Sequence, residues 1–230
     1  MIAPPPSPAR PSTPVRRDPA EGSVPLIHVD RSMIVAGKPV RLLSVPGRGP
    51  DKQDCLILRL QREFPDALIV HRLDFDTSGL IVLARGKKMH RALSLLFQER
   101  RVEKRYVAIV EGRPEESEGE IDLPLCVDWP NRPLHKVDSE SGKPALTRYR
   151  VIGHDDTHHA SRVVLVPETG RTHQLRVHMR AIGHPILGDP LYADGEVRNK
   201  ADRLLLHAEW LSLTHPVTGK RLAFSSAAPF

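Results

Sequence analysis

Cysteine is scarce in this sequence of 230 residues. Cys55 and Cys126 are its two cysteines; they lie far apart, and neither belongs to a C-x-x-C pair. This usage favours a reducing compartment and argues against a structural zinc site. We expect both thiols to be buried.

Long apolar runs are also missing. No stretch approaches the roughly 18 residues of a membrane span, and no signal-peptide core is present. We therefore expect a soluble, cytoplasmic protein. The sequence has no G-x-x-x-x-G-K-[ST], no G-x-G-x-x-G after a strand and no H-E-x-x-H, so nucleotide triphosphate, dinucleotide and zinc-protease functions lack support.

Histidine is plentiful, with 12 residues, but its spacing does not predict a metal site. His154, His158 and His159 lie in a polar Gly-Asp-Asp loop. His173 and His178 are five positions apart, whereas ligands on one helix face are three or four apart. We expect no bound metal.

Positive charge is in excess, with a formal net charge of +6 and a sequence pI of about 9.6. A polyanion is therefore a plausible partner. Residues 1–25 are rich in proline and carry Arg10, Arg16 and Arg17 with few acids. We expect a disordered basic tail over residues 1–25, because its prolines forbid the amphipathic helix of a transit peptide.

From Leu26 onward, strand and helix patterns mix without the regular alternation of a doubly wound sheet, which predicts an α+β fold with a mixed, mainly antiparallel sheet and flanking helices. Strands are expected over residues 26–29, 33–35, 81–84, 106–110, 145–152, 161–166, 204–213 and 221–224. Helices are expected over residues 55–64, over 87–100 with an apolar face of Ala92, Leu93, Leu96 and Phe97, and from an N-cap at Thr172 through Arg180 to an end near Gly183.

Basic side chains gather on the second of these helices and just after it: Lys87, Lys88, Arg91, Arg100, Arg101, Lys104 and Arg105. Such a run is either a solvated helix face or a surface that binds phosphates.

The most informative segment is residues 71–80, H-R-L-D-F-D-T-S-G-L. It sets Asp74 between a basic pair and a Thr-Ser-Gly turn. The apolar run at 81–84 predicts a buried strand, so Asp74 lies in a connection that leads into a rigid element. Taken alone, Arg72 and Asp74 could also form a structural ion pair or a turn bond.

Two further segments favour chemistry: residues 170–179, G-R-T-H-Q-L-R-V-H-M, and residues 104–110, K-R-Y-V-A-I-V. Together the three segments resemble the RluA-type pseudouridine synthases. The likeness covers nearly everything after about Pro25 and includes residues 42–47, 123–125, 128–133, 183–189 and 203–209. The pieces L-L-S-V-P-G and D-W-P-N-R-P are most similar to the short members that modify both large-subunit ribosomal RNA and tRNA anticodon stem-loops.

The chain departs from the family at residues 37–42, G-K-P-V-R-L, where the family usually shows N-K-P-x-G-L. Val40 and Arg41 therefore replace a flexible turn. None of the residues matched to catalysis lies there, so the difference bears on local turn shape and RNA contacts.

The resemblance implies a catalytic domain over residues 26–230, without the N-terminal S4 RNA-binding domain of longer relatives. It implies isomerisation of uridine to pseudouridine in large-subunit ribosomal RNA, in the tRNA anticodon stem-loop, or in both. The partner is then RNA and not a membrane, no cofactor is needed, and, since no dimer interface is evident, we expect a monomer.

Roles for individual residues follow from the same resemblance. Asp74 is the nucleophile, Arg176 the arginine that pairs with it, and Tyr106 the tyrosine that stacks on uracil or helps move its C5 proton. Four residues are assigned to substrate binding. Leu175 packs under the base, and Arg72 fills the gap left by the flipped uridine. His71 either assists Arg72 or packs in the fold, and Arg171 either binds phosphate or has a structural role. A carboxylate in a water-excluding pocket would be neutralised by desolvation, which is why a buried cation must lie beside it.

Two other classes of function remain open. A hydrolase would use Asp74 and Asp76 as paired carboxylates and would need a divalent metal or a second catalytic acid. An inactive RNA-binding protein would not depend on Asp74. We assign Asp76 a structural role in the turn and take the pseudouridine synthase as the main hypothesis, with an enzyme that acts on ribosomal RNA alone as its nearest alternative.

Overall fold

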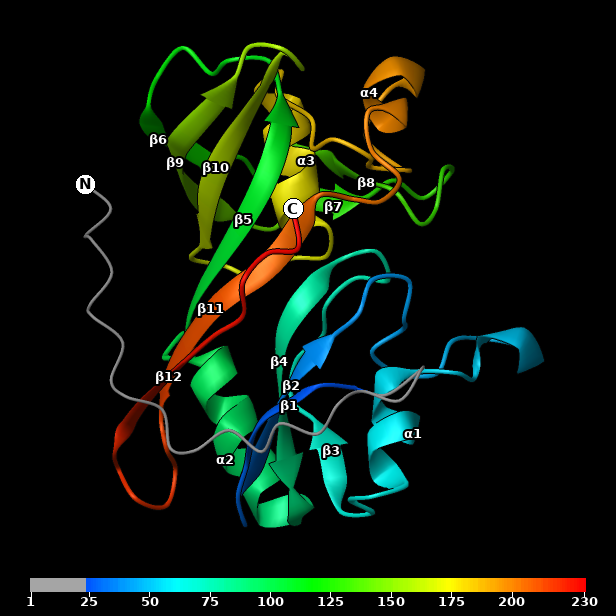
Figure 1. The fold of residues 1–230 in the computed structure, drawn as a ribbon. Coiled ribbons are helices and arrows are strands. Elements are labelled where there is room, and N and C mark those ends of the chain that lie inside the picture. Colours follow the sequence, from blue (N-terminus) through cyan, green and yellow to red (C-terminus); the bar gives the residue numbers. More distant parts are fainter. Residues whose placement is uncertain (1–23) are drawn as a thin grey trace. The chain divides into compact units, whose positions relative to one another are not determined.

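The computed structural model describes residues 24–230, so nearly all of the tail expected over residues 1–25 lies outside the described residues. The chain forms two compact units (Figure 1). We call residues 24–104 with 208–229 the N-terminal unit, and residues 105–207 with Phe230 the central unit. The chain passes from one unit to the other within two strands, β5 (Glu103–Glu111) and β11 (Leu206–Thr214).

The sheet of the N-terminal unit is built around β4 (Ser78–Arg85), whose residues 81–84 are buried as expected. β2 (Met33–Lys38) runs antiparallel to β4, with Val35 opposite Val82. Three further pairs are also antiparallel: β1 (Leu26–Val29) with β2, β3 (Ala67–Ile69) with β4, and β12 (Arg221–Ser225) with β11. A strand buried along its whole length reads as a continuous apolar run, which is why the sequence located β4 well.

Helix α2 (Gly86–Gln98) packs against β3 and β4. Its Leu93 and Leu96 are buried in one cluster with Leu80 and Val82 of β4, which confirms the expected apolar face. Helix α1 (Leu56–Gln61) is shorter than predicted and closes with a tighter turn, in which the Glu63 N–H donates to the Leu60 carbonyl three residues earlier. A short 3₁₀ helix, η1 (Pro50–Lys52), precedes α1.

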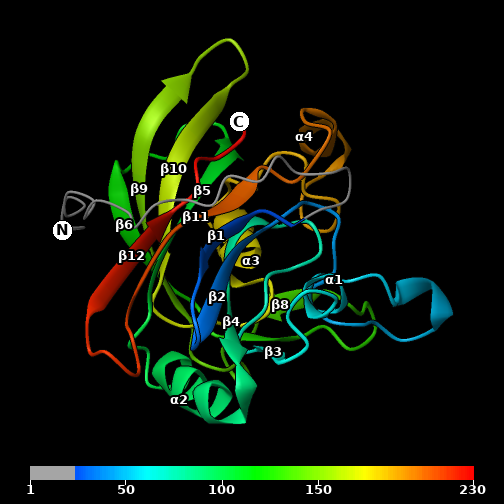
Figure 2. The ribbon, with the colours of Figure 1, turned by 60° about the horizontal axis from the view of Figure 1, so that its bottom comes forward.

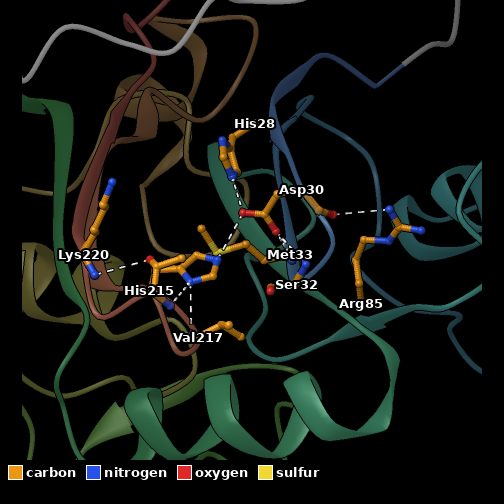
Figure 3. Close-up of polar contacts among 9 residues, drawn as sticks. His28, Asp30, Ser32, Met33, Arg85, His215, Val217 and Lys220 are labelled. Carbon is orange, nitrogen blue, oxygen red and sulfur yellow. Dashed lines mark hydrogen bonds and ion pairs between the residues drawn. The ribbon is translucent and has the colours of Figure 1, made fainter.

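A polar cluster ties the β1–β2 turn to the β11–β12 hairpin within the N-terminal unit (Figure 3). The Asp30 carboxylate lies 2.8 Å from His28 Nε2 and 3.2 Å from His215 Nε2. Its other oxygen accepts the backbone N–H groups of Ser32 and Met33 at 2.6 and 2.9 Å. These bonds to the ionised form outweigh desolvation and lower the pKa of Asp30.

The central unit holds an antiparallel sheet in the order β5, β10 (Ala160–Pro167), β9 (Leu146–Asp155) and β6 (Glu118–Asp122). Figure 2 shows the long β9–β10 pair side by side, with the loop that joins the two strands. A separate hairpin pairs β7 (Leu125–Val127) with β8 (His135–Val137) and contacts helix α3. The expected strands in this region are confirmed, although β6, β7 and β8 were not anticipated.

Helix α3 (Gln174–Ala181) packs against β9 and β10. The predicted N-cap at Thr172 is wrong: His173 occupies the cap, in the left-handed region with φ 56°, and its side chain makes no capping bond. Gln174, the first residue of the helix, reaches back outside it: its Oε1 accepts the Arg171 N–H at 3.0 Å and fixes the chain that leads into the helix.

The end of α3 near Gly183 is confirmed. Gly183 has φ 85°, its N–H donates to the Arg180 carbonyl, and the His184 N–H donates to the Met179 carbonyl. This pair of bonds is the Schellman motif, which requires a left-handed residue that glycine supplies at little cost. The last helix, α4 (Gly195–Asn199), begins at Asp194, whose side chain accepts the Val197 N–H.

The described strands and helices make an α+β fold, and the named strand pairs are antiparallel, which confirms the predicted fold class. None of the helices between residues 24 and 230 is long and apolar enough to cross a membrane.

Candidate active site

Asp74 lies half-buried in the tight turn that leads into β4. The Thr77 N–H donates to the Asp74 carbonyl at 3.2 Å and closes this turn. On its N-terminal side, Leu73 is held by Ser44, whose hydroxyl donates to the Leu73 carbonyl at 2.8 Å and accepts the Leu73 N–H at 3.2 Å. Both backbone groups of the residue before Asp74 therefore bind one buried side chain.

On the C-terminal side of Asp74, the turn is held by Lys38 at the end of β2. The Lys38 side chain is only 1% exposed. Its ammonium donates to the carbonyls of Pro39 at 2.9 Å, Leu42 at 2.7 Å and Phe75 at 3.1 Å. A buried ammonium is stable only with such partners, so Lys38 binds the residue after Asp74 to the end of the sheet. Sequence reasoning missed both Lys38 and Ser44.

His71 has a defined contact in the same unit. Its Nε2 accepts the Val82 N–H of β4 at 2.9 Å, and its ring stacks on Phe97 of α2 with centroids 4.3 Å apart. Burial, reinforced by the positive charge of Lys104, lowers the pKa of His71 to about 3. The neutral ring matches the Val82 bond, because only unprotonated Nε2 can accept. The neighbouring Arg72 is exposed.

Tyr106 and Leu175 share one hydrophobic cluster in the central unit. Tyr106 lies half-buried on β5, opposite Leu165 of β10, and packs against this cluster. Leu175, on the first turn of α3, is 7% exposed and belongs to it. The sheet and the helix thus present an aromatic ring and an apolar side chain to the same core.

Arg176, the next residue of α3, is 2% exposed and makes a bidentate ion pair with the fully buried Asp189. The Arg176 Nε donates to Oδ2 at 2.8 Å and Nη2 donates to Oδ1 at 2.6 Å. The guanidinium also lies over the Tyr192 ring, 5.1 Å from its centroid. The sequence analysis did not identify Asp189 and Tyr192 as partners of Arg176. Asp189 is nevertheless an acid in an otherwise apolar stretch, between Gly188 and Pro190, and such a position indicates a buried carboxylate that needs a cation.

Arg171 contacts the scaffold of the central unit: its Nε donates to the Pro144 carbonyl at 3.0 Å. The predicted site residues therefore fall into two groups. His71, Arg72 and Asp74 belong to the N-terminal unit, and Tyr106, Arg171, Leu175 and Arg176 belong to the central unit.

Metal-binding groups do not cluster in the described part of the chain: residues 24–230 contain no set of three His, Cys, Asp or Glu side chains placed to hold an ion. His178 is engaged by Thr147 at 2.9 Å and by the Leu123 carbonyl at 3.0 Å, and burial lowers its pKa. Cys55 is buried as expected, but Cys126 is only half-buried, because it lies on the small β7–β8 hairpin, where it contacts Asp138.

Comparison with known proteins identifies the family. Residues 32–181 match the family model described as RNA pseudouridylate synthase. The chain is 51% identical over 214 residues to the dual-specificity RNA pseudouridine synthase RluA of Escherichia coli K12, covering 92% of this chain and 96% of the relative. It is 51% identical over 205 residues to the protein of the same name in Yersinia pestis, covering 89% and 99%.

Solved structures agree. Human RNA pseudouridylate synthase domain containing 1 superposes with a TM-score of 0.76 at 30% identity, covering 94% of this chain and 87% of that one. Human RNA pseudouridylate synthase domain containing 4 gives a TM-score of 0.73 at 28% identity, covering 89% and 88%. The chain belongs to the RNA pseudouridine synthase family.

Proposed function

We propose that this chain converts uridine to pseudouridine in both large-subunit ribosomal RNA and the tRNA anticodon stem-loop, with residues 26–230 as the catalytic domain. The observation that carries the proposal is the identity of 51%, over nearly the whole chain, to relatives whose name states dual specificity. Because both substrates are cellular RNAs, we place the enzyme in the cytoplasm. We also expect it to act as a monomer.

Asp74 is the proposed nucleophile. Its carboxylate forms a bond to ribose C1′ or to uracil C6. The bond from C1′ to N1 breaks and the uracil turns. A bond from C1′ to C5 then forms, the bond to Asp74 breaks and frees the carboxylate, C5 loses its proton, and N1 takes one up. A nucleophile and an acid/base suffice, since nothing is oxidised or reduced. The bonds from Ser44 and Lys38 to the residues on either side of Asp74 support this role, because a fixed backbone aims a short side chain.

Arg176 is the proposed cation for Asp74, with Tyr106 as the residue that stacks on uracil or moves the C5 proton and Leu175 as the apolar floor. The bidentate contact with Asp189 supports the role of Arg176, since it fixes the plane of the guanidinium. The shared cluster of Tyr106 and Leu175 supports a joint role for these two side chains.

Arg72 is proposed to fill the gap left by the flipped uridine, and its exposure supports contact with RNA. The contacts of His71 with Val82 and Phe97 favour its packing role over direct assistance. The bond from Arg171 to Pro144 likewise favours a scaffold role over phosphate binding.

The test measures tritium release from RNA labelled at uracil C5, with EDTA present and with an anticodon stem-loop and a ribosomal hairpin as separate substrates. Wild-type protein is compared with Asp74→Asn and with Asp76→Asn, a matched change in the same turn. We expect release from both RNAs, a loss of at least about 1000-fold in Asp74→Asn, and activity retained in Asp76→Asn.

Each contrary result points to one alternative. No tritium release by wild type, together with cleavage of the RNA or loss of its base in a parallel reaction without EDTA, would favour paired carboxylates and hydrolysis. Release from the ribosomal hairpin alone would restrict the enzyme to ribosomal RNA. Binding of both RNAs without release would leave the inactive RNA-binding protein.

A further inference from the structure

The loop from Asp128 to Leu134, between β7 and β8, carries an aromatic side chain that the proposed chemistry does not use. Trp129 is 67% exposed, the largest exposure among the large hydrophobic side chains of the described residues. The Arg132 guanidinium lies over its ring, 4.8 Å from the centroid. The exposed indole, with an arginine on one face, is an aromatic surface on which a planar ligand can stack.

The loop holds its shape through its own hydrogen bonds. The Asp128 N–H donates to the Leu134 carbonyl at 2.9 Å, and the Leu134 N–H donates to the Asn131 carbonyl at 3.0 Å. The Asn131 side chain donates to the Asp128 carboxylate at 2.9 Å. Trp129 is therefore presented by an ordered turn, which lowers the entropy cost of binding to it.

The same loop is connected to the arginine of the proposed site, all within the central unit. Leu134 packs against a cluster that contains Tyr192. The next residue, His135, donates its N–H to the Tyr192 hydroxyl at 2.9 Å, and the Arg176 guanidinium lies over the Tyr192 ring. A short chain of contacts thus joins the exposed Trp129 loop to Arg176.

We propose that Trp129 and Arg132 form a platform on which an unpaired base of the substrate RNA, other than the target uridine, stacks. This inference rests on the proposed function. Every base has a π-face, so an exposed aromatic ring binds unpaired bases with little sequence preference, and an adjacent arginine adds attraction for both the base and its phosphate. The net charge of +6 suits an RNA ligand better than an apolar protein segment.

The test is a fluorescence titration in the Asp74→Asn background, where RNA binds without turnover. The protein has two tryptophans, Trp129 and Trp210, so the signal of Trp129 is the difference between this protein and the same protein carrying Trp129→Phe. The probes are an anticodon stem-loop and a fully paired duplex with the same stem. We expect the stem-loop, and not the duplex, to quench Trp129.

Affinity and kinetics supply the second readout. Trp129→Ala is expected to raise the Kd for the stem-loop by about 5-fold or more, and in the active enzyme to raise KM more than it lowers kcat. Trp129→Phe should restore most of the affinity, and Arg132→Lys should lose part of it, because lysine lacks the stacking plane. The control is Val217→Ala, which removes a 64% exposed apolar residue of the N-terminal unit and should change nothing.

An unchanged Kd in Trp129→Ala, or equal quenching by stem-loop and duplex, would overturn the platform and leave the proposed function intact if wild-type protein releases tritium. Quenching without any tritium release from wild type would support the platform and reject the proposed function. The two failures are distinguishable because binding is measured without turnover.

Discussion

Arg176 and Asp189 form a buried, bidentate ion pair, with Nε to Oδ2 at 2.8 Å and Nη2 to Oδ1 at 2.6 Å. The Asp189 carboxylate also accepts the backbone N–H groups of Leu191 and Tyr192 at 2.9 and 3.1 Å. The buried Arg176 guanidinium thereby has a charged partner, and its plane is fixed.

Asp189→Asn should destabilise the protein by about 3–5 kcal/mol, because it removes the carboxylate charge that makes a bidentate pair with the buried Arg176 guanidinium. Urea unfolding measures this loss. The matched control is Asp156→Asn, which breaks an exposed pair with Arg113 at 3.0 Å and should cost no more than about 1 kcal/mol. Similar small losses in both variants would show that the buried pair contributes no more than a surface one.

Lys38→Met should destabilise the N-terminal unit by about 3 kcal/mol or more, because it removes the ammonium that binds the carbonyls of Pro39, Leu42 and Phe75. Lys143→Met, at an exposed lysine, is the control for the loss of one charge. Urea unfolding of both variants measures the difference. Equal stabilities would mean that water satisfies these carbonyls as well as Lys38 does.

Arg41→Gly should stabilise the protein by about 0.5–1 kcal/mol. Arg41 stands where the family usually has glycine, and it adopts φ 57°, a left-handed conformation that costs a side chain about 1–2 kcal/mol. Glycine removes this strain and gives back part of the gain through its greater freedom in the unfolded state. Arg48→Gly, in an exposed loop where φ is not positive, should instead be neutral or destabilising by thermal unfolding.

The elements that could be predicted from sequence are those whose signal is local. The buried run of β4 and the apolar face of α2 lie within single windows of the chain, and both were located within a few residues. The position of Asp74 before β4 follows from the same run. The end of α3 was also predicted, since the glycine that ends a helix lies next to its last turn.

Contacts between distant segments could not be predicted. Ser44 binds Leu73 across 29 positions, and the Lys38 ammonium binds the Phe75 carbonyl across 37. The sequence shows a serine and a lysine of ordinary type, and only the folded sheet turns them inward. The left-handed backbone of His173, where α3 begins, likewise has no local sequence signal, so the pattern placed the cap one residue early, at Thr172.

Acid should destabilise the protein partly through His71. Its pKa is about 3 in the folded state and about 6.5 unfolded, so between these values the unfolded state binds more protons and stability falls as pH decreases. Because the ring is partly exposed, we expect a loss of about 1–2 kcal/mol between pH 7 and pH 5 from this group. His71→Gln lacks the titrating ring, so its free energy of unfolding should fall less over the same interval. Parallel pH profiles for the two proteins would assign the acid sensitivity to other groups.

The basic face of α2 should contribute to RNA affinity through phosphates. Lys87, Lys88 and Arg91 are exposed on this helix. Replacing all three with glutamine should weaken binding of the anticodon stem-loop. It should also reduce the slope of log Kd against log salt concentration by about 2, since each phosphate contact contributes roughly 0.7–0.9 to that slope. The control is a triple variant with the same loss of charge, in which glutamine replaces three other exposed residues, Arg113, Arg198 and Lys220. This control should leave the slope nearly unchanged. Filter binding at several salt concentrations gives both slopes. If the two triple variants lose the same amount, the contribution of α2 is the general charge of the protein; a loss confined to the α2 variant places phosphates on that helix.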